Sequence, residues 1–261
     1  MSDSILELER DGHIARVWMN RPDKKNSITR EMLDRFNQVI TEVDADPKLR
    51  VLVLRGRGGT FCSGYDLGQL QADYLKSSAG QELAKLASET LARLYAMRTP
   101  SLAVVEGHAT AGGFELMISC DFAIAAVEAK IGDFHIRRAL IGGAGPMYRL
   151  PRMIGVRKTK ELMMTGRLLS GIDAERWGLV NEIAPAAELD AAVSAFVGML
   201  ADKSPLQLAL VKMTVDQSLD ASVQSMMVME QLAVMNTFQS DDAAEGVAAF
   251  LEKRPPVWSG K

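Results

Sequence analysis

The chain of 261 residues is short of several residue types, and each shortage argues against a class of protein. Its two cysteines, Cys62 and Cys120, are too few for a disulfide framework and fit a reducing compartment. The three histidines are scattered, and neither cysteine has neighbours at the spacing of zinc ligands, so we predict no metal site. No apolar run reaches the length of a membrane span, which argues against a membrane partner.

The chain also lacks a strong excess of charge of either sign. Lysine and arginine number 30 against 33 aspartates and glutamates, so the formal net charge is −3. This balance offers no electrostatic reason to expect nucleic acid or an anionic membrane as the main partner. Four charged residues interrupt the N-terminal segment, which therefore does not resemble a secretory signal peptide: Asp3, Glu7, Glu9 and Arg10. Together these observations favour a cytoplasmic enzyme.

The most informative stretch is a glycine-rich turn between two apolar segments. The run Ser101–Val105 predicts a buried strand, Phe114–Cys120 predicts a buried helix, and Gly112 and Gly113 mark the turn. A helix N-terminus offers unpaired N–H groups, and Glu115 adds a carboxyl group among apolar side chains. This pairing suits a reaction that builds an oxyanion and moves a proton nearby. An ordinary turn with a surface glutamate is the competing interpretation.

The pKa of Glu115 is left open by the sequence. Burial among apolar side chains would raise it, whereas the helix N-terminus would lower it. A raised value near neutrality would suit proton delivery to a carbon atom.

The N-terminal part alternates between strand and helix patterns. Ile5–Glu9 and His13–Met19 flank an Asp-Gly turn and predict a hairpin. A helix with an apolar stripe follows, capped by either Ser27 or Thr29, and Leu49–Leu54 predicts another buried strand. Strand, helix and strand in this order indicate a parallel crossover.

A second glycine-rich segment, Gly56–Leu67, follows that strand and is predicted as a loop. A long helix is predicted over Gln81–Met97, before the strand that leads into Gly112. A strand followed by a glycine-rich loop therefore occurs twice. The two copies could bring two backbone N–H groups together.

From about Leu189 onward the pattern is only helical, with helices predicted over residues 189–201, 205–219, 222–238 and 241–253. Ser204-Pro205 is a plausible hinge, so we predict a core over 1–204 and a C-terminal helical region over 205–261. The last part is rich in methionine, which favours core packing or a subunit interface over an adaptable acyl pocket: Met226, Met227, Met229 and Met235.

Taken together, the motifs along the whole chain resemble those of the enoyl-CoA hydratase/isomerase family, the crotonase superfamily. Each motif alone is weak, but the four occur in order at the family's spacing. They are Asn20-Arg21-Pro22 with Asn26, Phe61–Leu67, Ala111–Leu116 with Cys120-Asp121, and Ala244–Arg254.

The resemblance implies an α/β fold of the crotonase type, a spiral of repeated β-β-α units followed by helices that build a trimer, often paired into a hexamer. It implies an acyl-coenzyme A thioester as substrate and no permanently bound cofactor. The thioester carbonyl would lie between the backbone N–H groups of Tyr65 and Gly112. These donors would stabilise the negative charge that collects on the oxygen.

The resemblance also places coenzyme A contacts on two parts of the chain. One is the segment Tyr65, Asp66, Leu67 and Gly68, where the family folds over the adenine, together with Ser63 before it and Gly112 of the oxyanion pair. The other is Phe250 and Lys253 near the C-terminus, which in some members reach the site of a neighbouring subunit. A cation such as Lys253 at a helix end is as easily explained by solvation.

The chain departs from the hydratase pattern at one catalytic position. Hydratases of this family use two glutamates, of which the first maps to Glu115 and the second maps to His135, twenty positions on. The Gly143-Ala144-Gly145 motif fixes this alignment. Glutamate and histidine can still do acid–base work, because imidazole titrates near neutral pH. His135 could instead fill the pocket wall, and Asp133 or Arg138 could orient or replace it.

Three functions follow from these residues. The first is hydration of a 2,3-enoyl-CoA, with Glu115 handling protons and His135 assisting. The second is isomerisation or hydrolytic C–C cleavage on the same scaffold, which the missing second glutamate favours. The third is a catalytically silent protein that binds coenzyme A or RNA, for which Arg157–Lys160 is a small basic cluster. A cluster of this size usually forms a solvated helix face.

Overall fold

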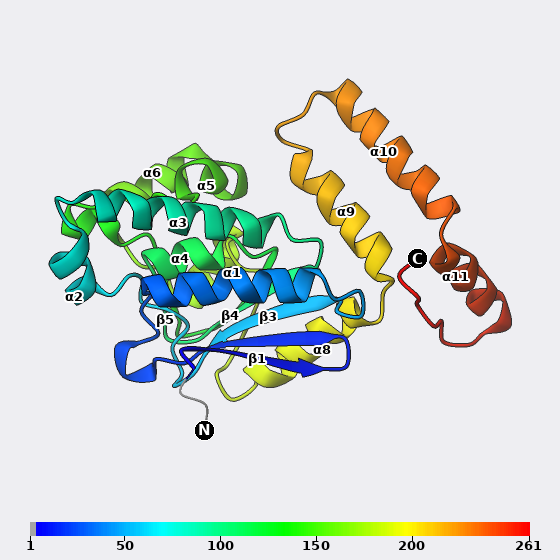
Figure 1. Ribbon diagram of the computed structural model, residues 1–261, viewed down its shortest axis with the longest axis horizontal. Helices are drawn as coiled ribbons and strands as arrows, with labels where there is room; N and C mark the ends of the chain where they lie inside the picture. Colours follow the sequence, from blue (N-terminus) through cyan, green and yellow to red (C-terminus); the bar gives the residue numbers. More distant parts are fainter. Residues whose placement is uncertain (1–3) are drawn as a thin grey trace.

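A computed structural model describes residues 4–261, and Asp3 lies outside the described residues. A six-stranded sheet forms its centre, with strand order β1-β2-β3-β4-β6-β8 (Figure 1). The first two strands form the predicted antiparallel hairpin, and the rest join in parallel, so the predicted crossover is confirmed. The strands are β1 Leu6–Asp11, β2 Ile14–Met19, β3 Val51–Gly56, β4 Ser101–Val105, β6 Phe122–Ala126 and β8 Glu182–Ala184.

A second, two-stranded sheet lies beside the first. Its strands β5 His108–Thr110 and β7 Lys130–Gly132 pair in parallel. The strand β5 falls in the glycine-rich stretch that was predicted as a turn, and that prediction is wrong there. The glycines around it gave a local turn signal, whereas the strand forms because β7 pairs with it. On its other side the Cys62 N–H donates to the His108 carbonyl at 2.8 Å.

Helices cover both faces of the main sheet. The helices α1 Arg30–Asp44 and α3 Ser78–Tyr95 pack against one another, while α8 Leu189–Ala201 packs against β3, β6 and β8 (Figure 1). Of the two capping candidates for α1, Thr29 takes the role, since its side-chain oxygen accepts from the Met32 N–H at 3.2 Å. The apolar stripe of α1 is buried in the core, as its spacing predicted.

Short helical turns surround the loops that follow β3 and β5. The helix α4 Gly112–Met117 begins at the predicted glycine turn and ends before Cys120. No helix was predicted over α2 Leu67–Gln69 and the π-helical turn Leu70–Tyr74. Two 3-10 turns, Pro22–Lys24 and His135–Arg138, complete this set.

The remaining core helices are α5 Pro146–Ile154, α6 Val156–Thr165 and α7 Gly171–Trp177. The basic cluster Arg157–Lys160 lies on α6, where Lys158 stands 5.3 Å from the ring centre of Trp177. Within residues 4–261 we find no helix long and apolar enough to cross a bilayer.

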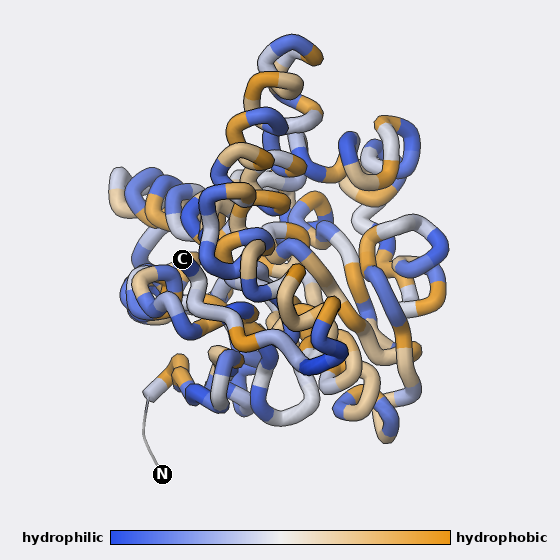
Figure 2. Tube along the Cα trace, turned by 90° about the vertical axis from the view of Figure 1, so that its right-hand side faces the viewer, coloured by the Kyte–Doolittle hydropathy of each residue, from blue (hydrophilic) through white to orange (hydrophobic). Residues whose placement is uncertain are grey.

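The last three helices extend away from the sheet: α9 Pro205–Gln217, α10 Val223–Phe238 and α11 Asp241–Glu252 (Figure 1). Hydrophobic residues recur along the part that protrudes at the top of Figure 2. No α10 residue is buried, so core packing of its methionines within one chain is wrong. The reason is that α10 contacts chiefly its neighbours α9 and α11.

Two polar anchors hold these helices. On α9, Lys212 donates to the Tyr95 carbonyl at 2.7 Å and pairs with Asp121 of the core. On α11, the buried Asp242 accepts from the Ser259 N–H at 2.6 Å and the Gly260 N–H at 3.1 Å. The chain end is thereby tied back onto the start of α11.

Candidate active site

The two glycine-rich segments meet at the carboxyl end of the sheet. The Thr110 N–H donates to the Cys62 carbonyl at 3.1 Å, which lays the segment before Tyr65 along β5. A Cβ atom on Gly64 would lie only 3.1 Å from the Gly112 nitrogen. Across residues 4–261 neither the Tyr65 N–H nor the Gly112 N–H has a hydrogen-bond acceptor. Two unpaired backbone donors therefore stand next to one another, as the repeated pattern predicted.

A strained backbone directs one of these donors. Ala111 has φ 51° and ψ −122°, a region that residues with a side chain rarely adopt. Its N–H donates to the Gly132 carbonyl at 3.2 Å, and its carbonyl accepts from the Glu115 N–H at 3.0 Å. Such strain costs about 1–3 kcal/mol and persists where the surroundings enforce it, often at functional sites.

The side chain of Glu115 is buried at the start of α4, with 1% of its surface exposed. Its Oε1 accepts from the Ala144 N–H at 3.0 Å. Burial raises the pKa of Glu115, and the charge of His135 and the backbone donors of Ala144 and Gly143 only partly oppose it. The sequence left open whether the pKa of Glu115 is raised or lowered. In the structure the effect of burial is the larger one, and the pKa is raised.

His135 lies on the 3-10 turn after β7 and is also buried. Its Nδ1 is 2.8 Å from Asp133 Oδ1, which also accepts from the His135 backbone N–H at 3.1 Å. Burial lowers the pKa of His135, but the hydrogen bond to Asp133 and the charge of Glu115 outweigh it, so the pKa is raised. Since Nδ1 is taken by Asp133, Nε2 is the nitrogen left for chemistry.

Asp133 completes this group. Its Oδ2 is buried and has no hydrogen-bond partner among the described residues. A Cβ atom on Gly142 would lie 3.0 Å from that oxygen and 2.7 Å from Glu115 Oε1, so both carboxyl groups face the space that this glycine leaves. Within residues 4–261 we find no group of three His, Cys, Asp or Glu side chains that could hold a metal ion, and this includes the group around Glu115.

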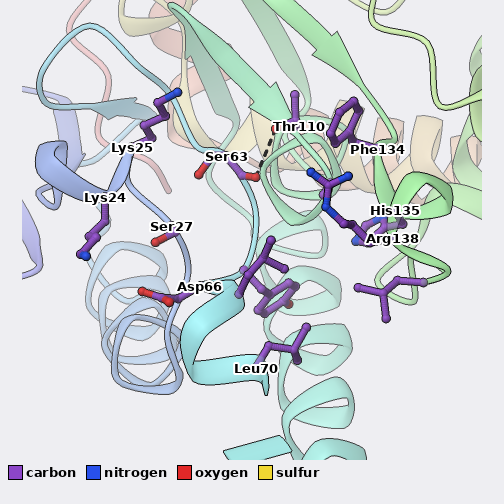
Figure 3. A pocket seen from close by; sticks show the side chains of 14 residues that line it. Lys24, Lys25, Ser27, Ser63, Asp66, Leu70, Thr110, Phe134, His135 and Arg138 are labelled. Carbon is purple, nitrogen blue, oxygen red and sulfur yellow. Dashed lines mark hydrogen bonds between the residues drawn. The ribbon is translucent and has the colours of Figure 1, made fainter. Parts of the chain in front are cut away.

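Two cavities adjoin these residues. The outer one, of about 440 Å³, is lined by the cations Lys24, Lys25 and Arg138 together with Ser27 and other polar groups (Figure 3). The inner one, of about 210 Å³, is mostly apolar and contains Glu115. Its apolar lining comes from α3 and the following loops and includes Leu83, Ala84, Ala87, Ile141 and Ala144.

The two cavities share a neck, which we define by the residues that line both: Tyr65, Leu70, His135 and Leu140. Glu115 lies on the inner side of this neck, and the three cations lie on the outer side. A molecule with a charged part and an apolar part could therefore place the junction of the two beside the titratable groups.

Four of the residues predicted to contact coenzyme A line the outer cavity, namely Ser63, Tyr65, Asp66 and Leu67. Gly68 follows them and donates its N–H to Asp66 Oδ1 at 3.1 Å. The other oxygen of Asp66 pairs with Arg21 at 3.0 Å, and this bond holds the pKa of Asp66 below its usual value.

Phe250 and Lys253 are placed elsewhere. Phe250 is 82% exposed on α11, and Lys253 is the left-handed residue that ends this helix. The helix α11 lies on the right of Figure 1, whereas α2 and α4 lie on the left. Neither residue lines a cavity with Glu115 in the single chain.

Sequence reasoning missed several residues around the site. Lys24 and Lys25 line the outer cavity, but lysines in a polar loop carry no pattern of their own. Asn26 is part of the Asn20-Arg21-Pro22 motif described above, but the sequence alone assigned no function to it. Its buried side chain donates to the Arg57 and Thr60 carbonyls at 2.9 and 2.6 Å, which joins the loops that carry the lysines and the second glycine-rich segment.

Comparisons with known proteins agree with this arrangement. The model of the enoyl-CoA hydratase/isomerase family matches residues 9–261. A putative enoyl-CoA hydratase/isomerase of Bacillus subtilis is 33% identical over 261 residues, covering 100% of both chains. A crotonyl-CoA hydratase of Syntrophomonas wolfei is 32% identical over 255 residues, covering 97% of both chains.

Solved structures give the same result. The crystal structure of an enoyl-CoA hydratase from Bacillus anthracis matches with a TM-score of 0.95 at 29% identity, covering 99% of this chain and 100% of that one. An enoyl-CoA hydratase from Mycobacterium smegmatis matches with a TM-score of 0.92 at 27% identity, covering 98% and 99%. The crotonase-type α/β fold that the motifs implied is confirmed.

Proposed function

The chain belongs to the enoyl-CoA hydratase/isomerase family, and from this premise we propose that it adds water to the 2,3-double bond of an enoyl-CoA thioester. The observation that carries the proposal is the position of the buried Glu115–His135–Asp133 group. It lies at the neck between a cationic outer cavity and an apolar inner one.

The two cavities suit the two halves of such a substrate. Lys24, Lys25 and Arg138 would attract the phosphates of coenzyme A, since cations are the usual partners of phosphate groups. The inner cavity would bury the acyl chain, which gains about 0.8 kcal/mol for each CH₂ removed from water. The thioester and the reacting carbons would then lie at the neck.

The unpaired N–H groups of Tyr65 and Gly112 would bind the thioester oxygen. As water adds, negative charge collects on this oxygen, and donors that are already in place stabilise it without reorganising. Each such donor contributes about 3 kcal/mol in other oxyanion holes. The strained backbone of Ala111 would fix the direction in which the following Gly112 N–H points.

The proton transfers fall to Glu115 and His135. Neutral His135 takes a proton on Nε2 from the attacking water, while Asp133 holds its Nδ1–H. The water oxygen bonds to the β carbon, and protonated Glu115 gives its proton to the α carbon. The imidazolium then returns a proton to the Glu115 carboxylate. One O–H bond and the C=C π bond break, and one C–O bond and one C–H bond form.

The His135–Asp133 pair also favours a second candidate. An imidazole held by a carboxylate is a general base for water in hydrolytic enzymes, which suits cleavage of a C–C bond. Isomerisation of the double bond would need only one group, Glu115, to move a proton between carbons.

Incubation with crotonyl-CoA and longer 2-enoyl-CoA esters, in water enriched in oxygen-18 and deuterium, separates these reactions. Hydration places oxygen-18 on the β carbon and deuterium on the α carbon. Isomerisation incorporates deuterium alone, and with a β-diketone substrate cleavage places oxygen-18 in a new carboxylate. Binding of these thioesters without a hydration product at any chain length would contradict the proposal.

We further propose that the chain acts as a homotrimer or a pair of trimers. The helices α9–α11 expose large apolar side chains, among them Phe238, Phe250 and Leu251 at 79%, 82% and 73%. Apolar surface of this extent is usually covered by another subunit. In such an assembly Phe250 and Lys253 would contact the coenzyme A bound to a neighbouring chain. Light scattering on the purified protein tests the trimer, and a monomer would contradict it.

A further inference from the structure

We propose that the side chain of Tyr65 selects against acyl groups that carry a substituent on the carbon next to the thioester. The proposal rests on the acyl-CoA substrate proposed above. It assigns a role to the ring of this residue, whereas the reaction uses only its backbone N–H.

One edge of the ring is fixed against Gly112. A Cβ atom on Gly112 would lie 2.7 Å from Tyr65 Cε2 and 2.9 Å from Cδ2. The same position is 3.4 Å from Ile28 Cδ1, so the ring and this side chain together occupy the space beside the Gly112 Cα. Real Cβ atoms do not approach ring atoms this closely, and the absence of a side chain at residue 112 is what admits the ring.

The other end of the ring is directed along the neck. Tyr65 lines both cavities, so its side chain forms part of the passage between them. Burial raises the pKa of the Tyr65 hydroxyl, and the charge of Glu115 is the next cause. The hydroxyl is therefore neutral. Because the ring lies beside Gly112 and Tyr65 lines the inner cavity together with Glu115, this side chain reaches from Gly112 to the space that holds the carboxyl.

The Tyr65 ring would lie beside the part of the acyl group where a substituent on the α carbon would be placed. A thioester oxygen bound to the Gly112 N–H leaves the α carbon two bonds away, beside the ring. A straight chain can continue past Leu70 and Leu140 into the inner cavity. A methyl group on the α carbon would have to displace the ring, which lies close against Gly112.

The hydroxyl offers a competing explanation for selectivity. Among the described residues it makes no hydrogen bond, so it could donate one to a bound acyl group. The variant Tyr65→Phe removes this donor and keeps the ring. Tyr65→Ala removes both and would join the two cavities at the neck.

The test measures binding of two saturated thioesters, butyryl-CoA and 2-methylbutyryl-CoA, by titration calorimetry. We expect the wild type and Tyr65→Phe to bind butyryl-CoA at least about 10-fold more tightly, because one misplaced methylene in a pocket costs 10-fold or more. In Tyr65→Ala the preference should fall below about 3-fold. Tyr65→Leu, which keeps an apolar side chain, should lie between the two and guards against a folding defect in the alanine variant.

Equal binding of both thioesters by the wild type would overturn the proposal, as would a preference that Tyr65→Ala retains. Loss of the preference in Tyr65→Phe would transfer the role to the hydroxyl and also overturn it. Because saturated thioesters are not hydrated, the result stands even if the protein does not catalyse hydration. Failure of the wild type to bind either thioester would contradict the acyl-CoA proposal itself.

Discussion

The two ends of the molecule treat polar and apolar groups in opposite ways. Around the neck, Glu115, His135 and Asp133 are buried, although burial of titratable groups opposes folding. On α10, by contrast, no residue is buried, and Leu232 and Phe238 are 58% and 79% exposed. The core thus hides groups that prefer water, and the C-terminal helices expose groups that avoid it.

The difference shows which part is complete on its own. Glu115 and His135 each have a partner in the same chain, the Ala144 N–H for Glu115 and Asp133 for His135. Among the described residues, large apolar side chains of α9–α11 such as Val211, Leu232 and Phe250 stay exposed. The groups around the neck thus find their partners within one chain, whereas the exposed apolar surface of α9–α11 is the part that the trimer proposed above would cover.

The largest effect is expected at the buried end of the molecule, from a substitution that removes the carboxyl group of Glu115. Glu115→Gln keeps the shape of the side chain but cannot deliver a proton. We expect kcat for hydration of crotonyl-CoA to fall about 10³-fold, within the range of general acid–base catalysis, with little change in KM. Steady-state kinetics measure this, and the exposed Glu128→Gln is the matched control. A fall below 10-fold would remove Glu115 from the proton transfers.

The second test addresses the exposed end. Leu232→Glu places a charge on the apolar surface of α10, and we expect it to convert the assembly to monomers, since a buried charge without a partner opposes association. Gln231→Glu adds the same charge beside it without removing apolar area. Light scattering reports the masses. An unchanged mass for Leu232→Glu would place the subunit contact elsewhere.

The third test changes the partner of His135. Burial lowers the pKa of His135 and Asp133 raises it, so Asp133→Asn should lower this pKa. Because neutral His135 is the proposed base, the acid limb of the kcat profile should move to lower pH. The lost orientation should reduce kcat by about 10- to 100-fold at the optimum. An unmoved acid limb would show that another group controls it.

The smallest expected effect concerns stability. The raised pKa of Glu115 contributes stability below the unfolded value of about 4.3, and this contribution is lost as the pH rises through the folded pKa. Glu115→Gln removes the cost of ionising this group in the core. Its melting temperature should exceed that of the wild type by roughly 2–4 °C at pH 8, and the gain should vanish near pH 4. A gain that is equal at both pH values would contradict the titration.

Local patterns predicted the regular elements well. The bounds of α8 match the predicted residues 189–201, because its apolar spacing is visible in the sequence. The strand β5 and the turn carrying His135 were not predicted, since their backbone partners lie far along the chain or depend on a side chain. Such elements have no periodicity of their own.

The site was predicted in part, and the reasons are equally physical. The repeated strand and loop suggested that two backbone N–H groups could meet, and the family resemblance assigned them to Tyr65 and Gly112. The direction of the Glu115 pKa did not, because it depends on how completely α3 and the Ala144 loop exclude water. The backbone of Ala111 gave no signal, since alanine does not mark a left-handed conformation as glycine does.

The chain end that Asp242 holds has a practical consequence for handling the protein. Asp242 accepts hydrogen bonds from the backbone N–H groups of Ser259 and Gly260, the two residues that precede Lys261. An affinity tag fused directly after Lys261 would begin beside these bonds and pull on the start of α11. A fusion at this end therefore needs a flexible spacer, so that the tag leaves the helices in the positions where a second subunit would meet them.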